Sequence, residues 1–78
     1  MPSKRIVLNQ TWTQISADST SKLVECVSGT GVAVEADAAP PETQTWGHPL
    51  RGGDPIRVTE SVYARASENS PQCVLIIT

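Results

Sequence analysis

The chain has 78 residues, a formal net charge of −2 and 18% charged residues. This length makes one domain, and a domain so small buries only about 60% of the surface of its unfolded chain. The charges form no long runs and no apolar stretch approaches roughly 20 residues, so we expect neither nucleic-acid binding nor a membrane span.

The first ten residues are predicted to form an arm, separate from a single β domain over residues 11–78. Residues 1–5 combine a proline, a serine and two positive charges, which is typical of a loose segment. The apolar run Ile6-Val7-Leu8 is then either a short strand or an arm that docks on a partner. Residues 12–16 mix β-forming and polar side chains, as in a half-exposed strand, and residues 17–21 are predicted to turn.

Two strands are predicted over residues 22–27 and 32–36, joined by Ser28-Gly29-Thr30-Gly31. Glycine readily adopts the positive φ that a tight hairpin loop requires, so the two strands read as a hairpin. The second strand alternates, with one apolar face formed by Val32, Val34 and Ala36 and the opposite face by Ala33, Glu35 and Asp37.

Residues 38–55 are predicted to form one long loop. They hold most of the chain's prolines, three of its five glycines, Trp46 and its only histidine. Proline cannot donate a ladder hydrogen bond, which argues against a central strand here. Because Trp46 and Leu50 are large apolar side chains that tend to find a surface to bury, we expect the loop to lie along its own domain or along a neighbour.

The last part of the sequence reads as a β-hairpin, with strands over residues 56–66 and 72–78 and a turn at residues 67–71. Glu60 falls on the apolar face of the first strand, which suggests a bulge or the margin of the sheet. Residues 74–77 are apolar on both faces, so both sides of the final strand should be covered. One side can face the core, and the other can face a second subunit.

No stretch has a helical period with capping residues, so the predicted class is all-β. Five to six short strands with turn signals between them indicate a small β-sandwich or barrel with one long Pro-rich loop. Such a small core usually needs a disulfide, a metal or oligomerisation. One histidine and two distant cysteines are too few to hold a metal, so we expect no metal, no other cofactor, and association with further chains.

Three side-chain features leave alternatives open. Cys26 and Cys73 each sit in an apolar run, where they are either reduced core residues or a disulfide, and the N-terminus shows no apolar signal segment that would favour oxidation. Trp12 and Trp46 are core or subunit contacts, or a platform for sugars. His48 lies in the predicted loop with no Gly-x-Ser-x-Gly elbow, so no catalytic residue and no enzymatic activity are expected.

Three short motifs and the closing strand follow one another along the chain in a distinctive order. They are Trp12-Thr13-Gln14-Ile15-Ser16, then Gly47-His48-Pro49-Leu50, then Val62-Tyr63-Ala64-Arg65-Ala66 and the closing apolar strand. In this order, over residues 12–78, the chain resembles small structural proteins of tailed bacteriophages. The resemblance implies a virion component present in many copies, on the capsid or in head or tail fibres, without enzymatic activity.

The expected function is therefore that of a capsid decoration or cement protein that acts as an oligomer, with a fibre component or glycan-binding adhesion module as the alternative. The expected partners are further copies of the chain and the major capsid protein or another virion protein. The expected location is the virion, assembled in the host cytoplasm. The residues predicted to make protein contacts are Ile6, Leu8, Trp46, His48, Leu50, Tyr63, Arg65 and Ile76.

Overall fold

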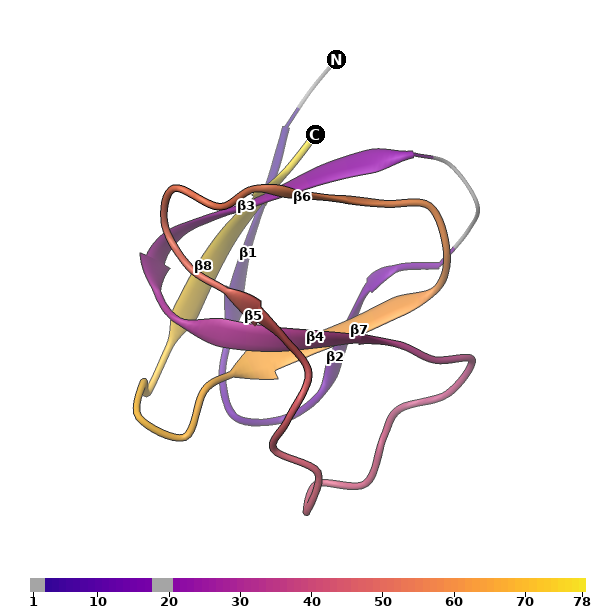
Figure 1. Ribbon diagram of the computed structural model, residues 1–78, viewed down its shortest axis with the longest axis vertical. Helices are drawn as coiled ribbons and strands as arrows, with labels where there is room; N and C mark the ends of the chain where they lie inside the picture. The colour runs from indigo at the N-terminus through magenta and orange to yellow at the C-terminus, as the bar shows by residue number, and fades with distance from the viewer. Residues whose placement is uncertain (1–2, 18–20) are drawn as a thin grey trace.

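The computed structural model describes residues 3–17 and 21–78, so most of the turn predicted at residues 17–21 lies outside the described residues. Two four-stranded antiparallel sheets form the fold (Figure 1), and the predicted all-β class is confirmed. The described residues form eight strands rather than the five to six expected: β1 (Lys4–Leu8), β2 (Thr13–Ser16), β3 (Lys22–Gly29), β4 (Gly31–Glu35), β5 (His48–Leu50), β6 (Ile56–Val58), β7 (Val62–Ala66) and β8 (Cys73–Ile77).

The strand order is β1-β8-β3-β6 in the first sheet, here called sheet A, and β2-β7-β4-β5 in the second, sheet B. In Figure 1 β1 and β8 run steeply down the view while β4 crosses it, so strands of the two sheets lie at a large angle. The described residues contain no helix that could cross a membrane. Ser3 and Thr78, near the two ends of the chain, lie side by side with their hydroxyl oxygens 3.1 Å apart.

The core lies between the sheets and consists of side chains that alternate along the strands, as the pleat requires. Two buried apolar residues, Trp12 and Val74, are not part of this core cluster, because they lie on the outer faces of sheets B and A. The core cluster consists of Leu8, Ile15, Val24, Cys26, Ala33, Leu50, Val58, Val62, Ala64, Ala66, Cys73, Leu75 and Ile77.

The predicted hairpin over residues 22–36 is wrong, because its two strands belong to different sheets. β3 pairs with β6 and β8, whereas β4 pairs with β5 and β7. A register shift between Cys26 and Ser28 and the positive φ of Gly29, 72°, turn the chain sharply into the other sheet. Strands that change sheet at a bulge or bend are characteristic of sheets packed at a large angle.

The predicted closing hairpin is wrong for the same reason. The segment 56–66 divides into β6 in sheet A and β7 in sheet B, and β8 returns to sheet A between β1 and β3. Glu60, the charged residue that did not fit the apolar face, lies in the break between β6 and β7. Its misfit therefore marks the point where the chain leaves one sheet for the other.

Three further expectations are corrected. Lys4 and Arg5, predicted to be loose, begin β1, and of the two alternatives for the run that follows them the structure shows the strand. The 38–55 loop is interrupted by β5, an edge strand, where a proline is tolerated. In β4 the residue that enters the core is Ala33, while Val32 and Val34 face outward, opposite to the one-sided strand expected.

Candidate functional site

The outer face of sheet A carries an apolar strip that no part of the described chain covers completely. Among the described residues, three of the four exposed large hydrophobics lie on this face: Val7 is 47% exposed, Leu23 36% and Val27 53%. Val74 and the half-buried Ile76, from the central strand β8, lie between them. The alternation of β8 thus leaves an apolar surface on both sides of sheet A, one in the core and one toward solvent.

Two charged residues flank the middle of this strip. Arg5 of β1 and Glu25 of β3 both stand opposite Ile76 in the register, one on each side of β8. Both are exposed, and two strand spacings, about 10 Å, separate their backbones. We call Arg5, Val7, Leu23, Glu25, Val27, Val74 and Ile76 together the A face.

The outer face of sheet B, by contrast, is covered by the chain itself. The indole N–H of Trp12 donates to the carbonyl oxygens of Pro41 and Gln44, each at 3.2 Å. The guanidinium of Arg65 donates to the carbonyls of Glu42, at 2.9 Å, and of Gln44, at 3.2 Å. These contacts hold the segment between β4 and β5 against the sheet.

Arg65 also lies over the ring of Trp12, with its guanidinium carbon 5.7 Å from the ring centroid. This distance is within the range of a cation–π contact. Both side chains are only 6% exposed. Arg65, one of the residues predicted to make protein contacts, therefore anchors the loop of its own chain.

Trp46 lies in the same covering segment but has no such anchor role. Its side chain is 70% exposed, the most exposed of the large hydrophobic residues in the described chain. The adjacent Gly47 packs closely on β4: a Cβ there would lie 2.7 Å from the Ala33 carbonyl oxygen. The backbone beside Trp46 is thus held on sheet B while most of the Trp46 side chain stays exposed to solvent.

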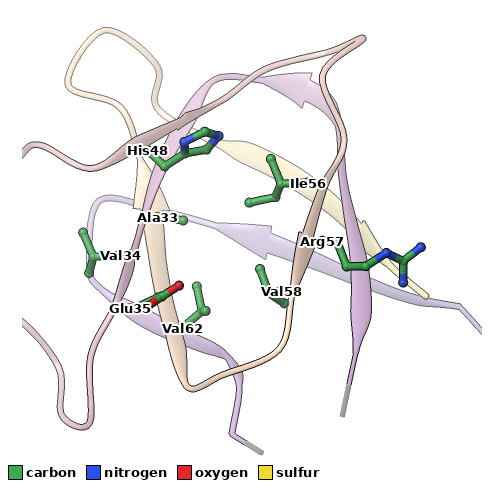
Figure 2. A pocket seen from close by; sticks show the side chains of 8 residues that line it. All are labelled: Ala33, Val34, Glu35, His48, Ile56, Arg57, Val58 and Val62. Atoms are coloured by element: carbon green, nitrogen blue, oxygen red, sulfur yellow. The ribbon is translucent and has the colours of Figure 1, made fainter. Parts of the chain in front are cut away.

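A cleft opens between the sheets where β6 of sheet A faces β4 and β5 of sheet B (Figure 2). Its volume is about 270 Å³ and its floor is apolar, from Ile56, Val58 and Val62. His48 and Glu35 lie at opposite sides of its mouth, while Arg57 points away from it. The cleft is smaller than the roughly 300–1,000 Å³ of most small-molecule sites. Its lining residues do not indicate a particular ligand.

Glu35 takes part in a carboxylate pair at the edge of this cleft. A hydrogen bond with Glu35, and then the negative charge of Glu35, raise the pKa of the exposed Glu60, with smaller contributions from desolvation and from Asp37. Two like charges held together favour protonation of one of them. No group of three or more His, Cys, Asp or Glu that could hold a metal occurs in the part of the chain that the structure describes.

The eight residues predicted to make protein contacts lie in different environments. Leu8 and Leu50 are fully enclosed in the core, and Ile6 packs against it from β1. His48 is exposed at the cleft mouth, and Tyr63 is half-buried on the outer face of sheet B. Of the set, Ile76 lies on the A face, and Trp46 is exposed in the segment between β4 and β5.

The structure brings in residues that the sequence reasoning missed. Val7, Leu23 and Val27 complete the A face, and their signal was present as apolar residues alternating with Leu8, Val24 and Cys26 in β1 and β3. The alternation shows that these residues share one face only when both strands are known to flank β8. The motifs at residues 12–16, 47–50 and 62–66 lie at β2, β5 and β7, and the first and the last of them meet at the contact between Trp12 and Arg65.

Three comparisons with known proteins identified no relative of this chain. A scan against protein-family models, a search of curated proteins and a search of solved structures each gave no match for this chain.

Proposed function

We propose that this chain is a non-enzymatic structural protein of a bacteriophage virion, a capsid decoration or cement protein that acts as an oligomer. Its partners are further copies of itself and the major capsid protein or another virion protein. Its location is the virion, assembled in the host cytoplasm. The phage assignment depends on the motif resemblance, and the observation that supports an assembly role is the A face.

The A face suits a contact between copies because it combines an apolar centre with charges of opposite sign. Val7 stands opposite the buried Val74 on one side, and the exposed Val27 lies in the register shift of β3 on the other side. Burial of apolar surface contributes roughly 25 cal/mol per Å², so a strip of several exposed aliphatic side chains gains from being covered. Exposed apolar strips on small domains mark contact surfaces more often than isolated exposed residues do.

The charges favour a second copy of the chain as the occupant. If two A faces stack around a two-fold axis parallel to β8 above Ile76, Arg5 of one copy lies over Glu25 of its partner. The same pairing then occurs twice, as in every isologous contact. Charge complementarity of this kind selects the partner and the register more than it adds affinity.

The proposal is tested by light scattering on the purified chain at micromolar concentration. We expect an oligomer, and we expect Val27→Asp to shift the mass toward the monomer while the circular dichroism spectrum remains that of the folded β chain. Its melting temperature should fall, because the stabilisation from the contact between copies is lost. Thr13→Asp, at an exposed position of β2 in sheet B, is the matched control and should leave the oligomer intact. A well-folded wild-type monomer would contradict the assembly role.

A glycan-binding adhesion module is the second candidate, and the exposure of Trp46 is the observation that favours it. Sugars pack their apolar faces on an exposed indole. The platform of two tryptophans considered from the sequence is reduced to one, since Trp12 is buried with its N–H engaged. A fluorescence titration with a glycan library would then report binding that Trp46→Ala abolishes, whereas the decoration role predicts no response.

A further inference from the structure

Two free thiols face each other in the core of sheet A. Cys26 of β3 and Cys73 of β8 are 4% and 0% exposed, and their Sγ atoms are 3.6 Å apart, within hydrogen-bonding distance for sulfur. They are 47 positions apart in the sequence. Their meeting is therefore a product of the strand order, in which β8 is inserted beside β3.

The local backbone brings the two sulfur atoms together. In the register Cys73 stands opposite Gly29, while Cys26 stands opposite Leu75, so the pair is diagonal across the two strands. The register shift between Cys26 and Ser28 lies between these positions. From β4, a Cβ at Gly31 would come within 3.0 Å of the Cys73 Sγ, so the packing on that side confines the sulfur.

We propose that Cys26 and Cys73 are a modification site: an oxidisable pair that closes to an intramolecular disulfide between the two central strands of sheet A. Closure shortens the Sγ–Sγ separation from 3.6 Å to about 2.05 Å, the length of a disulfide bond. Because both side chains already face inward on neighbouring strands, rotation about their side-chain bonds with a small backbone movement brings the sulfurs together.

The oxidant we name is a low-molecular-weight disulfide such as oxidised glutathione. A thiolate of the pair attacks one sulfur of glutathione disulfide, forms a mixed disulfide and releases one glutathione thiolate. The second protein thiol loses its proton and attacks the protein sulfur of the mixed disulfide, which releases the second glutathione. In total two protein thiols become one disulfide and one glutathione disulfide becomes two glutathione thiols.

The structure also indicates which sulfur reacts first. Burial, and then the hydrogen bond with Cys26, raise the pKa of the Cys73 thiol to about 12, so its thiolate is scarce at neutral pH. Cys26 is the less deeply buried residue of the two, and its Sγ contacts the Gly29 carbonyl oxygen at 3.2 Å, at the corner where the chain leaves sheet A. We therefore assign the first attack to Cys26, during local opening at this corner.

The bond would connect β3 and β8 beneath the A face and constrain the unfolded chain over the long segment between them, which is the main source of disulfide stabilisation. Small domains commonly gain stability in this way. The inference does not depend on the proposed virion role, since the two sulfur atoms belong to the core of a single chain.

The test is to refold the full chain from denaturant in a buffer of reduced and oxidised glutathione, which gives both thiols access to the oxidant. Mass spectrometry should find a monomer chain lighter by two hydrogens, and trypsin should release residues 23–51 linked to residues 66–78. The melting temperature should exceed that of the sample treated with reductant by about 10 °C or more. Cys26→Ala and Cys73→Ala are the controls: neither can close the intramolecular disulfide, so neither should show the rise in melting temperature.

Three results would overturn the proposal: two free thiols after refolding in the redox buffer, glutathione adducts or interchain links as the main products, or a bond that leaves the melting temperature unchanged or lowered. If either alanine variant fails to fold, the comparison of oxidised and reduced wild type still decides between these outcomes. A second measurement follows the order of attack, since Cys73→Ala should accumulate the glutathione adduct in native buffer faster than Cys26→Ala.

Discussion

At the scale of single residues, Arg65 shows how position in the fold changes what a side chain does. Its place on the polar face of a strand and its type both favour an interface rim. In the structure the covering segment between β4 and β5 encloses it, and its donors meet the carbonyl oxygens of Glu42 and Gln44. A charged side chain enclosed in this way is stable only while its hydrogen-bond partners are present.

We therefore predict that Arg65→Met destabilises the fold by about 2 kcal/mol. The substitution removes hydrogen bonds from a charged donor and leaves the carbonyl oxygens of the loop without that donor. Urea unfolding followed by circular dichroism measures the change. Arg57→Met is the matched control: Arg57 is exposed and donates to the exposed Ser21 hydroxyl, so its loss should cost at most about 0.5 kcal/mol. Equal effects of the two substitutions would contradict the anchor role.

The carboxylate pair of Glu35 and Glu60 gives a prediction that depends on pH. Because the pKa of Glu60 is higher in the folded state than in the unfolded state, the folded state holds its proton more tightly. The bound proton of Glu60 therefore contributes favourably to the free energy of unfolding below the ordinary glutamate pKa. This contribution is lost as the pH rises through the raised pKa of the folded state.

Glu60→Gln should consequently raise the melting temperature slightly at pH 7, where it removes the repulsion, and the gain should disappear toward pH 3. Differential scanning calorimetry across this range makes the measurement. A gain of the same size at both ends of the range would show that the repulsion between the carboxylates is not its cause.

At the scale of elements, the sequence predicted the all-β class and most strand positions but not which strands pair. Alternation and turn residues are local signals, and they indicated strands near residues 12–16, 22–27 and 74–77 correctly. They do not say whether a turn joins two strands of one sheet or carries the chain to another. The sequence predicts a hairpin loop at Gly29 and a bulge or the margin of the sheet at Glu60, whereas each lies where the chain changes sheet.

The same limit applied to the candidate site. Ile76 was predicted as a contact residue because its strand is apolar on both faces, and it lies on the A face. Its neighbours Val7 and Val27 could not be predicted to join it, because that requires knowing that β1 and β3 flank β8. Leu8 and Leu50 were predicted as contacts from hydrophobicity alone, which does not distinguish a core side chain from a surface one.

The corner between β3 and β4 makes a specific demand on Gly31. A Cβ at this position would lie 2.7 Å from the Arg65 carbonyl oxygen, closer than a strand of the sheet can accommodate without shifting. Gly31→Ala should destabilise the fold by about 1–3 kcal/mol, as overpacking does. In urea unfolding, Gly52→Ala is the matched control, since the nearest atom to its Cβ would be 3.7 Å away. If Gly31→Ala were as well tolerated as Gly52→Ala, the close approach of β4 to the Arg65 carbonyl of β7 would be contradicted.

At the scale of the whole molecule, the two outer faces differ in a way that bears on assembly. Sheet B is covered by a segment of its own chain, anchored through Trp12 and Arg65. The A face has no comparable cover in the described chain and presents Val7 and Val27 to solvent. A domain of this size has a thin core, so covering the second face with another copy would add the stability that a larger domain gains internally.

The most direct test of this account exchanges the charges on the A face and measures the mass in solution by sedimentation velocity. If copies meet through this face, Arg5→Glu and Glu25→Arg should each dissociate the oligomer, because like charges then oppose each other twice. An equal mixture of the two variants should restore the oligomer, since each new glutamate meets a new arginine. Oligomers that persist in both single variants, or a mixture that stays monomeric after both singles dissociate, would contradict the claim that the A face is the contact.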